Sequence, residues 1–97
     1  MVDSQEKNIA NEVVVVTGGS RGIGAEIVKL LAKANHNVII NYNKSEECAK
    51  NVERELKKLG CTVDIFKADV SKKEEAESLI KFAINKYGRI DVLVNNA

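Results

Sequence analysis

The stretch Val13-Val14-Val15-Val16-Thr17-Gly18-Gly19-Ser20-Arg21-Gly22-Ile23-Gly24 decides which fold this chain can adopt. Four consecutive valines are β-branched and apolar on both faces of an extended strand, which is typical of a central parallel strand covered by helices on both sides. The glycines after them predict a tight turn, because glycine adopts positive φ values and lets another backbone or a phosphate come close. Apolar residues then recur with helical spacing, so a helix is expected over residues 22–34.

The start of this predicted helix forms an anion-binding site. Its first N–H groups have no partner inside the helix, and they point back toward the glycine turn. The helix dipole adds a partial positive charge at the same place, so a phosphate is the expected ligand. The buried face of the helix is expected to comprise Ile23, Ile27, Leu30, Leu31 and Ala34.

Length and composition indicate one small globular domain. The chain has 97 residues, of which 44% are hydrophobic and 30% charged. A net charge of +1 provides no strongly basic face, so no nucleic-acid partner is predicted. The longest apolar run is Val13–Val16, far too short to span a membrane. Residues 1–8 lack the apolar core of a signal peptide, and Cys48 and Cys61 lack metal-type spacing, so a cytoplasmic protein without a metal site is expected.

Strands and helices are expected to alternate after a polar lead-in of residues 1–11. The expected strands cover residues 12–17, 38–42, 62–68 and 90–94. Asn43 with Glu46 and Ser71 with Glu74 each predict a capping box, at the start of the second and third helices. The buried faces of these two helices are expected to comprise Ala49, Val52, Leu56 and Leu59, and Ala76, Leu79, Ile80, Ala83 and Tyr87. C′ glycines, Gly60 and Gly88, are expected to end them.

The order β-α-β-α-β-α-β predicts an α/β fold, with parallel strands joined by helical crossovers. Right-handed crossovers predict a Rossmann-like, doubly wound parallel sheet with strand order 3-2-1-4, formed by residues 12–97. The first two helices then share one face of the sheet and the third covers the other. Apolar positions such as Ile39, Ile65 and Val92 are expected to stay partly uncovered, and strand four is expected to be an open edge.

This topology predicts where a ligand binds. The carboxyl ends of strands one and four frame a crevice, which is the usual ligand site of an open α/β sheet. The glycine turn lies at one lip of the crevice, and residues 95–97 lie at the other. The glycine pattern is not the G-x-G-x-x-G fingerprint, and Ala25 and Glu26 occupy the positions where a P-loop needs Lys and Ser/Thr. Hydrolysis of ATP or GTP is therefore not expected, and a turn that only reverses the chain is the alternative.

The residues after the second strand favour NADP(H) over NAD(H). Asn41-Tyr42-Asn43 has no carboxylate where NAD-selecting folds carry an acid. Arg21 in the turn and Lys44 just past the strand add positive charge that attracts a 2′-phosphate. A charge-assisted hydrogen bond contributes roughly 1.5–3 kcal/mol. The alternative is that Arg21 only faces solvent.

Three motifs together resemble one known family. The motifs are Thr17 to Gly24, Ala68-Asp69-Val70 and Asn95-Asn96-Ala97. In order and spacing they resemble the N-terminal half of the short-chain dehydrogenase/reductase family, and most of all its NADPH-dependent 3-oxoacyl-[acyl carrier protein] reductases. The predicted cofactor-binding residues are Gly18, Ser20, Arg21, Gly22, Ile23, Gly24, Asn41, Tyr42, Asn43, Asp69, Val70, Asn95 and Ala97.

The resemblance implies a role for each motif. The three glycines shape the turn, Ser20 and Arg21 hold the phosphate on the adenosine ribose, and the backbone of Ile23 approaches the pyrophosphate. Asp69, with Val70 alongside, accepts a hydrogen bond from the adenine amino group. Residues 95 and 97 line the pocket through their backbone, and Asn96 braces the central strands. Two plainer alternatives are that Asp69 is only a turn residue and that residues 95–96 only end a strand.

The same resemblance implies that the catalytic residues lie beyond the fourth strand. The family uses a Tyr-x-x-x-Lys pair with a serine and a further asparagine. Here Tyr42 is followed four residues later by Glu46, and Tyr87 by Asp91, so no catalytic residue is predicted in the chain. The chain is therefore expected to be the inactive N-terminal part of a reductase that is truncated, cleaved or completed by a companion chain.

The expected parent enzyme transfers hydride from NADPH to a carbonyl. The resemblance implies a 3-oxoacyl thioester of fatty acid synthesis, held on an acyl carrier, as the substrate, and a homo-oligomer as the assembly. No membrane is expected as a partner. A non-catalytic nucleotide-binding module and a ligand-free interaction fragment are the two alternative functions.

Overall fold

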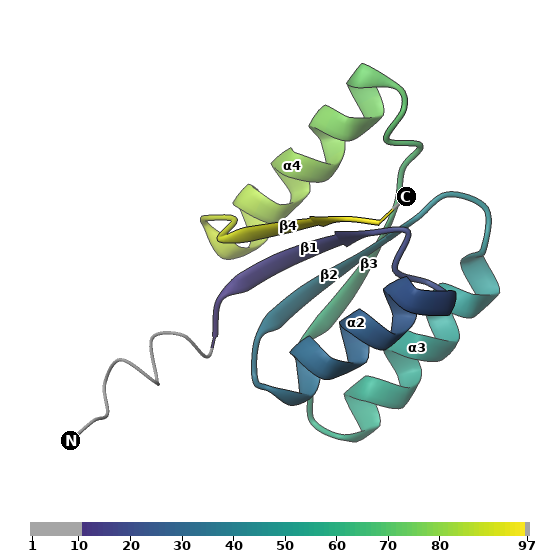
Figure 1. The fold of residues 1–97 in the computed structure, drawn as a ribbon. Coiled ribbons are helices and arrows are strands. Elements are labelled where there is room, and N and C mark those ends of the chain that lie inside the picture. Colours follow the sequence, from purple (N-terminus) through teal and green to yellow (C-terminus); the bar gives the residue numbers. More distant parts are fainter. Residues whose placement is uncertain (1–10, 97) are drawn as a thin grey trace.

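The computed structural model describes residues 11–96, so Ala97 and nearly all of the predicted lead-in lie outside the described residues. The elements are β1 (Val13–Thr17), α2 (Gly22–Lys33), β2 (Asn37–Tyr42), α3 (Glu46–Lys58), β3 (Val63–Lys67), α4 (Lys73–Tyr87) and β4 (Val92–Asn95). The strands form one parallel sheet in the order β3-β2-β1-β4 (Figure 1). The predicted fold class and strand order are confirmed.

The valine strand β1 lies inside the sheet and is buried on both faces. All five of its residues are buried, and it pairs with β2 on one side and with β4 on the other. Val14 and Val16 pack into the core under α2 and α3, whereas Val13 and Val15 pack into the core under α4. Successive side chains of a strand point to opposite faces, so only a strand that is apolar at every position can occupy this place.

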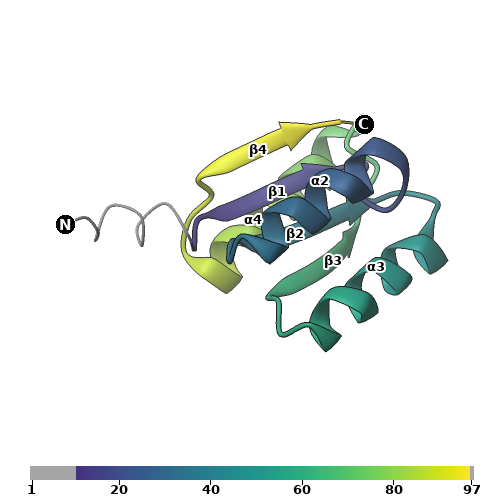
Figure 2. The same cartoon turned by 60° about the horizontal axis from the view of Figure 1, so that its bottom comes forward.

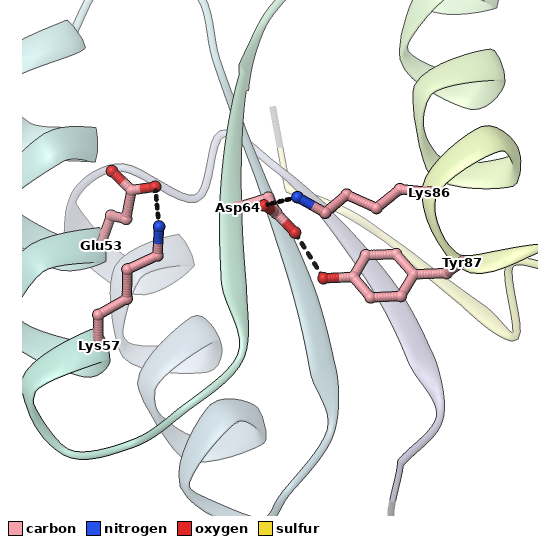
Figure 3. Close-up of polar contacts among 5 residues, drawn as sticks. All are labelled: Glu53, Lys57, Asp64, Lys86 and Tyr87. Atoms are coloured by element: carbon pink, nitrogen blue, oxygen red, sulfur yellow. Dashed lines mark hydrogen bonds and ion pairs between the residues drawn. The ribbon is translucent and has the colours of Figure 1, made fainter.

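The helices divide between the two faces of the sheet as predicted. α2 and α3 cover one face, and α4 covers the other alone (Figures 1 and 2). The side chain of Asp64 on β3 fastens α4 at its end, because it accepts hydrogen bonds from the Tyr87 hydroxyl and from Lys86 Nζ, the latter at 2.6 Å (Figure 3). The ion pair between Glu53 and Lys57 in the same view lies along α3 itself.

The predicted buried face of α2 is wrong at three positions, since Ala34 follows the end of the helix and is exposed. Ile23 and Leu30 are 74% and 73% exposed. The residues that α2 buries are smaller, namely Gly24, Ala25, Val28 and Ala32. A Cβ at Gly24 would lie 2.1 Å from the carbonyl oxygen of Gly18, so the helix starts in contact with the glycine turn. This close approach admits only small residues beneath the helix, and the large residues lie at its sides.

Three further predictions of packing are corrected. Ile39 is fully buried, because Leu79 and Ala83 of α4 pack in its cluster. Leu59 and Ile80 lie outside the core, with 61% and 40% of their surfaces exposed. The structure leaves Ile65 partly buried and Val92 39% exposed, as expected for the margins of the sheet.

The helix ends were predicted better than the helix starts. Gly60 and Gly88 follow α3 and α4 with φ values of 83° and 82°, as C′ glycines do. Both capping boxes are wrong, because α3 and α4 begin after Ser45 and Lys72, and neither residue makes a side-chain cap. None of the helices in residues 11–96 is long and apolar enough to cross a membrane.

Candidate cofactor site

The glycines between β1 and α2 are required by the backbone of the turn. Gly18 and Gly22 have φ values of 62° and 61°, in the left-handed region that other residues rarely adopt. Gly24 is required by space, since the Cβ of any other residue would overlap the Gly18 carbonyl. The turn therefore brings the amide groups at the start of α2 to the carboxyl end of the central strand.

The start of α2 differs from the starts of the other two helices in its charge. None of the three helix starts in the described residues has a side-chain cap, but only the first turn of α2 contains no acidic residue. The first turn of α3 carries Glu46 and Glu47, and that of α4 carries Glu74 and Glu75. Acidic side chains near a helix start interact favourably with its dipole. Only at α2, among these three helices, is that favourable place left open for an anion from outside.

A hollow of about 220 Å³ lies beside the glycine turn, on the side of β2. The residues that line it are Gly18, Ser20, Arg21, Tyr42, Asn43, Lys44 and Ser45. Arg21 and Lys44 are cationic and exposed, and none of the residues 11–96 that line the hollow carries a carboxylate. The turn and the end of β2, whose cations the sequence analysis assigned to one phosphate, thus meet in one basic depression. Its shape and charge fit a phosphate group.

Asn41 lies behind this hollow rather than in it. The residue is 2% exposed. Its Nδ2 donates to the carbonyl oxygens of Ala68 at 3.0 Å and Phe66 at 3.3 Å, and its Oδ1 accepts from the amide of Gly18 at 3.4 Å. The structure therefore places a predicted cofactor residue where its amide group is already engaged by the protein.

Asp69 and Val70 follow β3 at the same edge of the sheet, half-buried. The Asp69 carboxylate accepts hydrogen bonds from the Ser71 hydroxyl at 2.6 Å and the Ser71 amide at 3.1 Å. These bonds lower the pKa of Asp69 below its ordinary value, so it stays ionised and can accept a further hydrogen bond. The Asp69 amide donates to Glu75 at 2.7 Å, so Glu75, rather than the predicted Glu74, reaches back over the start of α4.

The end of β4 is fastened to the glycine turn. Asn96 Nδ2 donates to the Gly18 carbonyl at 3.1 Å, and the Asn96 amide donates to Thr17 Oγ1 at 2.9 Å. The predicted bracing role of Asn96 is confirmed. Asn95 pairs with Thr17 across the strands, so β1 and β4 lie side by side as predicted, although the hollow opens toward β2.

Sequence reasoning missed the part that Thr17 plays. Its buried hydroxyl lies 3.3 Å from both the Val94 carbonyl and Asn95 Oδ1 and accepts the Asn96 amide, so it joins β1 to β4. The available signal was a single polar residue that ends an otherwise apolar buried strand.

The sheet order, the glycine turn and the basic hollow are now defined, and comparison with known proteins identifies the family. The family model of short chain dehydrogenases matches residues 12–97. The chain belongs to the short-chain dehydrogenase family.

Curated relatives agree with this assignment. The short-chain dehydrogenase/reductase FrzI of Cladobotryum sp. is 39% identical over 90 residues, which are 93% of this chain and 35% of FrzI. The 3-oxoacyl-[acyl-carrier-protein] reductase FabG of Staphylococcus epidermidis is 41% identical over 87 residues, which are 90% of this chain and 36% of FabG. The chain thus spans little more than a third of the length of these relatives.

Solved structures share the fold over the same region. A dehydrogenase/reductase from Sinorhizobium meliloti aligns with a TM-score of 0.88 at 36% identity, covering 97% of this chain and 38% of the other. A short-chain dehydrogenase from Burkholderia cenocepacia, solved in complex with NADP, aligns with a TM-score of 0.85 at 38% identity, covering 91% and 36%. The chain therefore shares its β-α framework with part of these longer solved structures.

Proposed function

We propose that this chain forms the NADP(H)-binding part of an oxidoreductase that reduces a carbonyl by hydride transfer. The observation that carries the proposal is the basic hollow, where Arg21 and Lys44 lie beside an uncapped helix start and no carboxylate opposes a 2′-phosphate. The relative from Burkholderia cenocepacia, whose structure holds NADP, supports the same cofactor.

Each part of the site has a proposed task. The amides at Ile23 and its neighbours bind the pyrophosphate. Ser20, Arg21 and Asn43 surround the ribose phosphate, with Tyr42 at the floor of the hollow. The other proposed contacts are the turn glycines Gly18, Gly22 and Gly24, the adenine-binding Asp69 with Val70, and the backbone of Asn95 and Ala97.

When bound, the nicotinamide of the cofactor supplies the hydride. The described residues provide no evident proton donor for the carbonyl, since the Tyr87 hydroxyl is hydrogen-bonded to Asp64 on the face covered by α4 and Tyr42 is buried. We therefore place the catalytic residues outside this chain or its described part. A 3-oxoacyl thioester on an acyl carrier is the proposed substrate, supported by the 41% identity to FabG.

Titration of NADPH and NADH into the full-length protein tests the cofactor assignment. Arg21→Ala and Lys44→Ala should each weaken NADPH binding about tenfold, which corresponds to about 1.4 kcal/mol, and should leave NADH binding nearly unchanged. Lys33→Ala, at the opposite end of α2, is the matched control. Equal losses for both cofactors would show that the two cations do not select the 2′-phosphate.

The substrate and the assembly need separate experiments. NADPH consumption with a 3-oxoacyl thioester, compared with a simple ketone of similar size, tests the substrate class. The proposal includes a cytoplasmic location and a homo-oligomer, or a complex with a companion chain that carries the catalytic residues. Mass measurement of the native assembly by light scattering distinguishes these two states from a monomer.

A further inference from the structure

We infer that Asn41 is a positioning residue, which holds the glycine turn and the Asp69 turn at the separation that the two ends of an adenosine phosphate require. This inference rests on the proposed function, because it concerns the same cofactor site. It assigns Asn41 a task different from direct contact with the cofactor.

The first observation concerns the glycine turn. Both polar backbone groups of Gly18 are held by asparagine side chains. Its amide donates to Asn41 Oδ1 at 3.4 Å, and its carbonyl accepts from Asn96 Nδ2 at 3.1 Å. The next amide, that of Gly19, donates to the backbone carbonyl of Asn41 at 3.0 Å. The turn is thus fixed from the β2 side by Asn41 and from the β4 side by Asn96.

The second observation concerns the opposite side of Asn41. Its Nδ2 donates to the carbonyls of Phe66 and Ala68, and Ala68 directly precedes Asp69. The Ala68 amide also donates to the carbonyl of Tyr42 at 2.9 Å. One side chain therefore links the end of β1 to the end of β3 across β2, which separates these two strands.

The third observation is that Asn41 is a polar residue in a buried position, which is unfavourable for stability. Asn41 follows Ile39 and Ile40, which are fully buried, and is itself only 2% exposed. A buried amide destabilises a protein unless its donors and acceptor are hydrogen-bonded. An apolar residue would fill this position without that requirement. Aspartate could not replace it, because a carboxylate only accepts and would face the Ala68 carbonyl.

The test compares two nearly isosteric replacements in the full-length protein. Asn41→Val removes both hydrogen-bonding groups, whereas Asn41→Thr keeps a hydroxyl that can donate and accept. NADPH fluorescence titrations should show about tenfold weaker binding for Asn41→Val, equivalent to about 1.4 kcal/mol, and a partial rescue by Asn41→Thr. Ile39→Val is the control, since it thins the same strand away from the turn and should lower the melting temperature without changing NADPH affinity.

The outcomes separate this inference from the proposed function. If the wild-type protein binds no NADPH, the proposed function fails and the inference fails with it. If the wild-type protein binds NADPH and Asn41→Val binds it equally well, only the inference is overturned. A threonine variant that binds no better than the valine variant also overturns it. Should Asn41→Val fail to fold, Asn41→Ala, which also removes both hydrogen-bonding groups, replaces it, and wild-type affinity in that variant overturns the inference.

Discussion

The β1–α2 junction and the β3–α4 junction follow the same plan and treat the start of the helix in opposite ways. Before α4 the turn is held by its own side chains, because Asp69 accepts from Ser71 and Glu75 accepts from the Asp69 amide, and two acids lie in the first turn of the helix. The first turn of α2 has no acidic residue, and the cationic Arg21 lines the hollow beside it. The comparison shows why the anion site is proposed at α2, because an added anion there meets no acidic side chain in the first turn of the helix.

The largest effect is expected from Gly24→Ala, which pushes the two halves of the β1–α2 junction apart. The added Cβ would lie 2.1 Å from the Gly18 carbonyl oxygen and 2.6 Å from Asn96 Nδ2, and the turn must open to admit it. The free energy of unfolding should fall by about 3 kcal/mol, as measured by urea denaturation of the full-length protein. Gly60→Ala is the control, because its Cβ meets nothing within 4 Å and costs only the left-handed conformation, about 1 kcal/mol. Equal losses would contradict the packing argument.

The next effect comes from making the start of α2 resemble the other helix starts. Ile23→Glu places a carboxylate in the first turn of α2, where it competes with a bound phosphate. Because Ile23 is 74% exposed, stability should change by no more than about 0.5 kcal/mol, while NADPH affinity should fall about tenfold. Leu30→Glu, on the same helix and 73% exposed, should leave the affinity unchanged. Equal NADPH affinities in the two variants would show that the start of α2 does not contact the bound cofactor.

A smaller effect on stability is expected at the β3–α4 junction, where Asp69 accepts hydrogen bonds from Ser71. Hydrogen bonds from Ser71 lower the folded-state pKa of Asp69, so its contribution to stability is present above its unfolded-state pKa and is lost as the pH falls through the folded-state value. Asp69→Asn should therefore lower the melting temperature at neutral pH, and its difference from wild type should vanish in acid. Glu77→Gln, an exposed change on α4, the helix that follows Asp69, is the control. If the two melting temperatures differ as much in acid as at neutral pH, the effect comes from the altered shape of the side chain and not from its charge.

The smallest effect concerns the far end of α4. Burial and the hydrogen bond to Asp64 raise the pKa of Tyr87 above its ordinary value of 10.0. Its contribution to stability is fully present below the unfolded-state pKa and is lost as the pH rises toward the folded-state value. The melting temperature of Tyr87→Phe should therefore fall less steeply than that of the wild type as the pH rises into the alkaline range. If the melting temperature of the variant falls with alkaline pH as steeply as that of the wild type, the pKa of Tyr87 does not change on unfolding.

Local patterns were sufficient for the framework of the fold. The alternation of strands and helices, the parallel order 3-2-1-4, the two C′ glycines and the division of helices between the faces all follow from residues close together in sequence. The reason is that hydrophobic period and glycine position act within a few residues, and crossover handedness then leaves few topologies.

Contacts between distant residues decided the rest. Both capping boxes failed because Ser71 bonds Asp69 instead of capping α4, and because α3 begins only after Ser45. The exposure of Ile23 depends on how closely α2 approaches Gly18. The spacing of apolar residues along the helix does not predict this distance.

The order of strands, the place of the glycine turn and the absence of an acid after β2 were thus written in the chain, since each depends on residue type and spacing alone. Only the tertiary structure decided that Asn41 turns inward and that Arg21 and Lys44 line one hollow. The reason is that a buried polar group bonds to the partners that the fold brings near it, and for Asn41 one of these is the Ala68 carbonyl, 27 residues away in the sequence.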